Sequence, residues 1–136
     1  MTNTASTVVL DSTVVSYLFD NSGPAAYYAE HIRGKRPAIS FQTLEEVRFG
    51  MLRRNWGARR INEMRRHLQQ YEVIWATQSL IDVSIRLRVE RERVGRKLST
   101  ADAWIAATAV LLECPLASHD GDFVGITNLE LIRAPS

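Results

Sequence analysis

The chain has 136 residues, 46% of them hydrophobic, and a formal net charge of +2 at pH 7. No apolar run is long enough to cross a bilayer, and Met1–Thr7 contains neither a basic nor an apolar segment, so no membrane span or signal peptide is expected. The length fits one globular domain, residues 1–136, that buries about two-thirds of its unfolded surface. We therefore expect a single cytoplasmic domain.

Positive charge is concentrated in the middle of the chain. Residues 48–97 carry thirteen basic side chains against five acidic ones, a net of +8, and the rest of the chain sums to −6. Almost all of the basic residues are arginine, which forms forked contacts with phosphate. This segregation is compatible with a surface that binds a polyanion. It is equally compatible with ordinary solvated helix faces.

In the first half of the chain, predicted strands alternate with predicted helices. A β-branched run at residues 7–10 predicts a buried strand, and Asp11 separates it from helical spacing of Val14, Val15 and Leu18. A break at residues 21–24 precedes a helix over residues 25–32. A second strand is predicted at residues 37–40. The next helix places Glu46 in its first two turns, and its predicted apolar face consists of Leu44, Val47, Met51 and Leu52.

The second half continues the alternation. After Gly57 we expect a helix that buries Ile61, Met64 and Leu68 and exposes most of its arginines. The remaining strands are predicted at residues 72–75, 115–118 and 129–132, and the remaining helices at residues 79–94 and from a cap at Ser99 or Thr100 to Leu112. Short strands that alternate with helices predict a three-layer α/β domain with a mainly parallel sheet of four to five strands.

Acidic residues follow the predicted strands or begin helices. Asp11 follows the first strand, Glu46 comes soon after the second, Asp102 begins a helix, and Asp120 and Asp122 follow the fourth strand. Ligands of open parallel sheets bind beyond the carboxyl ends of the strands. Carboxylates gathered there would repel one another unless a cation neutralised them. Because Mg²⁺ prefers such oxygen ligands, we predict a Mg²⁺ or Mn²⁺ site.

Each of these carboxylates also has a purely structural interpretation. Asp11 and Asp102 could complement helix N-termini, and Asp120 and Asp122 could form a turn. Glu46 could pair with an arginine two turns further along its helix. The prediction of a metal site therefore depends on the joint placement of the acidic residues.

The histidines and the cysteine provide no alternative set of metal ligands. His31, His67 and His119 are isolated in the sequence, and Cys114 is the only cysteine, so the spacing of a zinc site is missing. Cys114 lies in an apolar stretch, and we expect it to be a small buried hydrophobic residue rather than a nucleophile.

Four segments with acidic residues follow one another in the chain. Residues 8–14 combine a strand with Asp11, residues 39–50 combine a strand with a threonine and Glu46, residues 98–109 begin the helix of Asp102, and residues 116–123 form a closing block with Asp120 and Asp122. In this order the segments resemble the motifs of PIN-domain ribonucleases, with residues 98–109 as the most specific match, and the length and motif order are similar to the VapC-type toxins of that family. The register of the second motif favours Glu46 over Glu45.

The resemblance implies metal-dependent RNA cleavage by a homodimer that a cognate antitoxin holds inactive. The implied catalytic residues are Asp11, Glu46, Asp102 and Asp120, where Asp11 is the central metal ligand and Glu46 orients the attacking water. The implied metal ligands are Asp11, Asp102, Asp120 and Asp122, with Asp120 ranked ahead of Asp122. Thr13, which stands where asparagine or serine is frequent, and Ser118 are implied supporting residues. The candidates for RNA backbone contacts are Arg48, Arg53, Arg54, Arg59, Arg60, Arg93 and Arg96.

Two other functional classes are considered. A receiver domain also gathers carboxylates and Mg²⁺, but it needs a lysine after a late strand, and Lys35 and Lys97, the only lysines, do not follow the fourth or fifth strand. The other class is a catalytically silent PIN-like module that binds RNA or an antitoxin. A nuclease assay with and without EDTA distinguishes that module from an enzyme.

Overall fold

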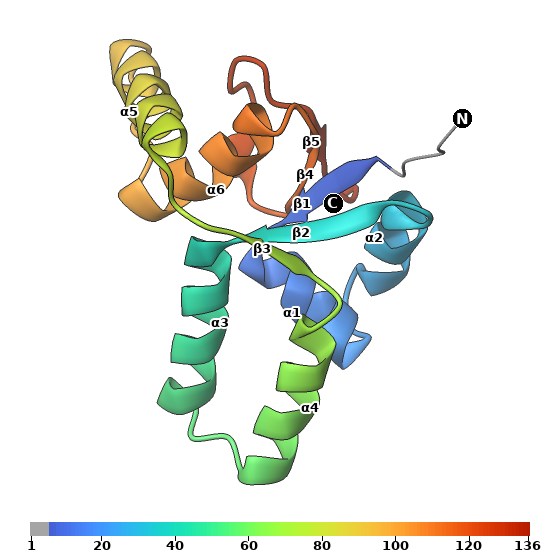
Figure 1. Cartoon of the computed structure of the whole chain (residues 1–136). Helices are drawn as coiled ribbons and strands as arrows, with labels where there is room; N and C mark the ends of the chain where they lie inside the picture. The colour runs from blue at the N-terminus through green and yellow to red at the C-terminus, as the bar shows by residue number, and fades with distance from the viewer. Residues whose placement is uncertain (1–5) are drawn as a thin grey trace, which may run out of the picture.

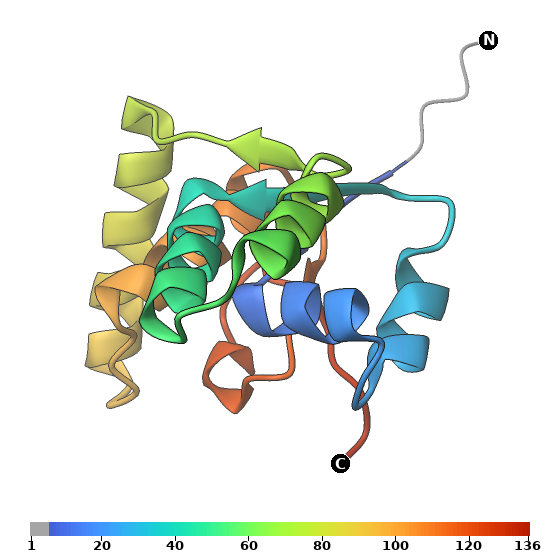
Figure 2. The same ribbon diagram turned by 90° about the horizontal axis from the view of Figure 1, so that it is seen from below.

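The computed structural model describes residues 6–136. Residues 1–5 lie outside the described residues, and so do the first residues of the predicted domain and most of the segment examined for a signal peptide. A sheet runs through the centre of the molecule, with helices on both faces (Figures 1 and 2). The strands are β1 Thr7–Leu10, β2 Arg36–Ser40, β3 Glu72–Ile74, β4 Leu116–Ala117 and β5 Leu131–Ile132. The helices are α1 Ser12–Asp20, α2 Ala25–Ile32, α3 Phe41–Arg53, α4 Ala58–Leu68, α5 Gln78–Arg93, α6 Thr100–Leu111 and the short 3₁₀ helix η1 Gly121–Phe123.

The strand order is β3-β2-β1-β4-β5, and every pair of neighbouring strands is parallel. The chain moves outward from β1 to β3 and then returns to build the other half of the sheet, so the direction of winding changes between β1 and β4. Leu10 pairs with Ala117 at this position. Asp11 and Ser118 therefore leave the sheet side by side, at the edge where α/β proteins bind ligands.

The strands alternate between two hydrophobic cores, as the pleat of a sheet requires. Val8 and Leu10 pack with α1, α2, α3 and α4 on one face, whereas Val9 packs with α5 and α6 on the other. All three valine and leucine side chains are fully buried. Figure 1 shows the resulting layers, in which the α3–α4 hairpin extends away from the sheet. The predicted three-layer α/β architecture is confirmed.

Several local predictions are wrong. The strands predicted at residues 115–118 and 129–132 keep only two residues each in β4 and β5, and the 3₁₀ helix η1 was not expected. Leu52 is 76% exposed, because it lies about 100° around α3 from buried Met51. Trp75 is 62% exposed beyond the end of β3. Cys114 is half-buried rather than fully buried, and burial raises the pKa of its thiol.

The irregular apolar pattern of α5 has a structural explanation. The buried side of this helix is formed by Leu80, Ser84, Leu87 and Arg91, which follow helical spacing although two of them are polar. Ile85 and its neighbours on the outer side stay in contact with solvent.

Within residues 6–136, no helix has the length and apolar character needed to span a membrane.

Candidate metal centre

Asp11 is the buried residue around which the site is built. It follows β1 directly and caps α1, where its Oδ1 accepts a 2.9 Å hydrogen bond from the backbone N–H of Val14. Its Oδ2 accepts a hydrogen bond from the hydroxyl group of Ser118. Only 4% of Asp11 is exposed. The strand end and the helix start therefore fix both carboxylate oxygens.

Ser118 connects Asp11 to the closing acidic segment. Ser118 is fully buried, and its Oγ accepts a 3.0 Å hydrogen bond from the backbone N–H of Asp120. Asp120 in turn caps η1, since its Oδ1 accepts from the backbone N–H of Asp122 at 2.9 Å. The hydroxyl proton of Ser118 is thus committed to Asp11. Its observed contacts orient acidic residues.

Asp102 approaches the same place from α6. Ser99 caps this helix by accepting a 3.1 Å hydrogen bond from the backbone N–H of Asp102, so Asp102 lies in the first turn. Asp102, Asp120 and Asp122 each offer a carboxylate oxygen within 4.8 Å of the others. The structure therefore brings these three predicted residues together, and Ser118 links them to Asp11.

Glu46 lies beside this group and is not one of the three. It lines a pocket of about 230 Å³ between α1, α3 and α4, together with Thr13 and Arg54. Its Oε1 is buried and has no hydrogen-bond partner within residues 6–136. The neighbouring Glu45 is exposed instead and accepts a 3.3 Å hydrogen bond from Gln42. None of the ion pairs found among the described residues includes Glu46, so the alternative pairing with an arginine is not observed.

The electrostatics of the site favour protons or a cation. Burial raises the pKa of Asp11 from its ordinary value of 3.8 to about 6, against the hydrogen bonds from Ser118 and Val14, and nearby Asp120 and Asp102 add to the rise. Burial also raises the pKa of Asp102 and that of Glu46, in each case with a contribution from neighbouring carboxylates. A divalent cation would relieve this repulsion.

The donor set fits Mg²⁺ or Mn²⁺. All of the grouped ligand atoms are carboxylate oxygens, which these hard cations prefer. The structural roles proposed as alternatives are observed, since Asp11 caps α1, Asp102 lies in the first turn of α6, and Asp120 and Asp122 form the turn that begins η1. They do not exclude a metal, because a carboxylate has about four lone-pair sites and a cap uses one.

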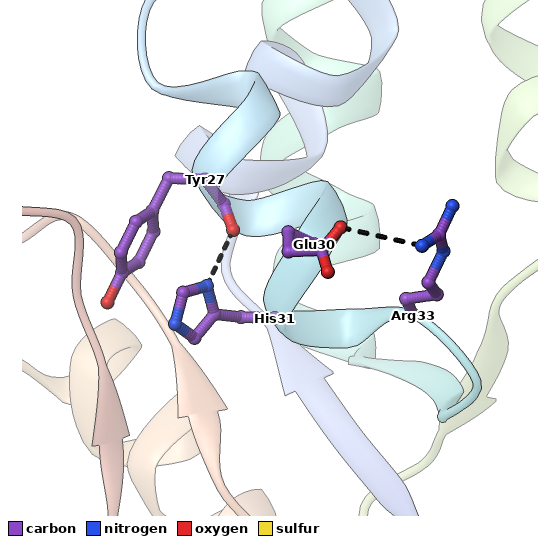
Figure 3. A network of polar contacts seen from close by, with 4 residues as sticks. All are labelled: Tyr27, Glu30, His31 and Arg33. Carbon is purple, nitrogen blue, oxygen red and sulfur yellow. Dashed lines mark hydrogen bonds and ion pairs between the residues drawn. The ribbon is translucent and has the colours of Figure 1, made fainter.

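The histidines take part in local contacts. His31 Nδ1 lies 2.8 Å from the backbone oxygen of Tyr27, on whose ring it stacks, and the adjacent Glu30 pairs with Arg33 at 3.8 Å (Figure 3). His67 contacts the hydroxyl group of Tyr71 at 2.8 Å.

The seven arginines proposed to contact RNA are all exposed. Arg48, Arg53 and Arg54 lie on or directly after α3, Arg59 and Arg60 begin α4, and Arg93 and Arg96 lie at the end of α5. Arg60 is partly occupied, since it pairs with Asp20 at 3.0 Å and lies over the ring of Trp56. Arg54 is the one that lines the pocket of Glu46.

Sequence reasoning missed three residues near the site. Ser12 lines the same pocket as Glu46 and partly offsets the rise in the pKa of this carboxyl group. Tyr28 is fully buried and contacts His119. A signal for Ser12 and for His119 lay in the motifs, because Ser12 follows Asp11 and His119 stands between Ser118 and Asp120. Tyr28 itself carried no such signal.

A parallel sheet with a carboxylate cluster at its switch point defines the protein as an α/β protein with a candidate metal centre. The family model of the PIN domain matches residues 8–129. The chain therefore belongs to the PIN-domain family.

Solved structures support this assignment. A chain of VapBC2 from Rickettsia felis, bound to a promoter DNA fragment, is 20% identical with a TM-score of 0.83, and the match covers 95% of this chain and 99% of that one. A toxin–antitoxin complex from Klebsiella pneumoniae is 27% identical with a TM-score of 0.71, covering 92% and 95%. VapBC-5 from Mycobacterium tuberculosis is 26% identical with a TM-score of 0.72, covering 95% and 99%. No curated protein matches the chain.

Proposed function

We propose that the protein is a Mg²⁺- or Mn²⁺-dependent endoribonuclease and the toxin of a toxin–antitoxin pair. The observation that carries this proposal is the group formed by Asp102, Asp120 and Asp122, whose oxygens lie within 4.8 Å of one another beside the buried Asp11. Membership of the PIN-domain family supports it as well.

The cation would supply charge neutralisation for an in-line attack of water on a phosphodiester. Asp11, Asp102 and Asp120 would hold it, and Asp122 is a further candidate ligand. Glu46 orients the attacking water and accepts its proton at Oε1, the buried atom that has no partner among residues 6–136. The raised pKa of Glu46 makes it a better proton acceptor than an ordinary carboxylate.

The RNA backbone would lie across the exposed arginines of α3, α4 and the end of α5. Arg54 is the best placed of them, because it shares a pocket with Glu46 and Thr13. Arginine contacts with phosphate position the strand without reading its sequence. Thr13 is exposed in this pocket and would assist by binding water or a phosphate oxygen.

The remaining parts of the proposal concern partners. The solved structures that the chain resembles include a toxin–antitoxin complex from Klebsiella pneumoniae and VapBC-5, a member of a family of toxin–antitoxin systems, which supports a cognate antitoxin that covers the site. We further propose a homodimer made of single-domain subunits that acts on RNA in the cytoplasm.

A cleavage assay with matched aspartate variants tests the enzyme. Purified protein is incubated with RNA in the presence of Mn²⁺ or EDTA, and the new 5′ ends are sequenced. We expect internal cuts that EDTA prevents. Asp11→Asn should abolish cleavage and keep the fold, whereas Asp20→Asn, on the same helix but exposed, should cleave normally.

Two results would contradict the proposal. The first is a folded Asp11→Asn protein that retains near-normal metal-dependent cleavage. The second is a wild-type protein that binds RNA or an antitoxin but cuts no RNA with either metal, which would identify the silent module instead.

A further inference from the structure

The hydroxyl group of Tyr28 joins three segments that are distant in the sequence. Tyr28 lies on α2 and is fully buried. The backbone N–H of Ala134 donates a 3.0 Å hydrogen bond to its hydroxyl oxygen, and Nδ1 of His119 lies 3.0 Å from the same oxygen. Because a buried hydroxyl without partners costs free energy, both contacts are needed to satisfy it.

The Tyr28 oxygen accepts from the backbone N–H of Ala134, and Nδ1 of His119 is the other partner found for this hydroxyl group among the described residues. Donation of the phenol proton to Nδ1 is the arrangement that leaves no buried donor without a partner. Burial raises the pKa of Tyr28, and the Asp11 carboxylate adds to the rise, so the phenol keeps this proton at neutral pH.

Aromatic packing and a backbone hydrogen bond also hold His119 in place. The ring packs edge-on against Tyr17, with centroids 5.9 Å apart, and against Tyr28, with centroids 6.1 Å apart. Nε of Arg133 donates a 3.3 Å hydrogen bond to the backbone oxygen of His119. His119 thus lies between α1, α2 and the tail that follows β5.

His119 separates the two residues that organise the acidic site. On one side, the hydroxyl group of Ser118 donates a hydrogen bond to Asp11. On the other side, the backbone N–H of Asp120 donates a hydrogen bond to the Oγ of Ser118. A rotation of His119 would move both neighbours, because the three residues are consecutive. The distance between Asp120 and Asp11 therefore depends on where the His119 ring is anchored.

We propose that Tyr28 and His119 are positioning residues of the acidic site. The Tyr28 hydroxyl anchors His119 to α2 and to the C-terminal tail, and this anchor sets Asp120 relative to Asp11. Neither residue contacts metal or RNA in this role. The inference rests on the proposed function, because it concerns the affinity of the same site for a cation.

Mn²⁺ binding to the full chain without RNA tests the proposal directly. In calorimetric titrations we expect Tyr28→Phe and His119→Leu each to weaken Mn²⁺ binding about fivefold, the worth of one hydrogen bond. His119→Asn should restore near-normal affinity, since its amide oxygen can accept from the Tyr28 hydroxyl. Tyr27→Phe, which removes a hydroxyl from the preceding residue of α2, should bind Mn²⁺ like the wild type.

The double variant separates a shared role from two independent ones. If Tyr28 acts through His119, Tyr28→Phe combined with His119→Leu should weaken Mn²⁺ binding no more than the larger single effect. Independent effects would multiply to about 25-fold, and that result would contradict a common anchor.

Amide hydrogen exchange gives a readout that needs no metal. The backbone N–H groups of Asp120 and Asp122 should exchange about fivefold faster in Tyr28→Phe, relative to the core amide of Val9. A folded Tyr28→Phe with wild-type Mn²⁺ affinity and exchange overturns the proposal. Should Tyr28→Phe fail to fold, equal Mn²⁺ affinities of His119→Leu and His119→Asn would overturn it. A wild-type protein that binds no Mn²⁺ refutes the proposed function, while the exchange comparison still decides the positioning role.

Discussion

Replacing Asp11 by asparagine should make the metal-free protein more stable at pH 8, although it removes the central residue of the site. In the folded protein the pKa of Asp11 is raised from 3.8 to about 6. The carboxylate is therefore ionised at pH 8 at a cost that the unfolded chain does not bear. Asparagine has the same shape without the charge, so it avoids this cost.

The magnitude follows from the two pKa values. Moving a carboxyl pKa from 3.8 to about 6 lowers the free energy of unfolding at pH 8 by about 3 kcal/mol. Below pH 3.8 Asp11 is protonated in both the folded and the unfolded state, so the folded protein does not bear this loss of stability. The loss develops as the pH rises through about 6. The advantage of Asp11→Asn should therefore shrink by about 2 kcal/mol between pH 8 and pH 4.5.

Urea denaturation in EDTA, followed by the fluorescence of the three tryptophans, measures both proteins at each pH. The comparison between the two pH values cancels effects that do not titrate, such as altered hydrogen bonding to Val14 or Ser118. The reasoning is refuted if the stability difference between Asp11→Asn and wild type is the same at pH 8 and pH 4.5. It is also refuted if the difference grows as the pH falls.

Two further predictions concern catalysis and RNA binding. Glu46→Gln should lower kcat by about 10²- to 10⁴-fold, as expected for loss of a general base. The variant Glu45→Gln, at the exposed neighbouring residue, should stay near wild type. If single-turnover kinetics showed the larger loss in Glu45→Gln, the role would belong to Glu45. In a cleavage-inactive Asp11→Asn background, Arg54→Gln should reduce the slope of log affinity for single-stranded RNA against log salt by about 0.7. Arg33→Gln, whose arginine pairs with Glu30 on α2, should leave that slope unchanged, and an equal change in both variants would argue against a local contact of Arg54.

The fold could be predicted to a large extent, because strands and helices in this chain have different apolar periods. The run of residues 7–10 and the spacing of Val14 and Val15 placed β1 and α1 correctly. The sequence failed where burial depends on partners distant in the chain. Arg91 is 8% exposed, and one of its guanidinium nitrogens lies 3.5 Å from the backbone oxygen of Val124, a neighbour that no local pattern reveals.

The candidate site was predictable only in its residue types and approximate location. Strand ends identify Asp11 and Asp120, because parallel strands bring their carboxyl ends to one edge. Spacing alone could not show that Ser118 would donate to Asp11. That contact depends on the pairing of β1 with β4, two strands separated by more than a hundred residues. Tyr28 was missed for the same reason.

The position of the site at the switch point has an energetic consequence. Asp11 and Asp120 meet only after both halves of the sheet have formed, because β1 and β4 pair across the whole sequence. In the unfolded chain these carboxylates are far apart and bind cations weakly, so a cation that fits the folded site stabilises folding. The raised pKa of Asp11 is the opposing cost when no cation is bound. The same carboxylates therefore weaken the metal-free protein at neutral pH and strengthen the metal-loaded one, which couples the stability of the fold to occupancy of the site.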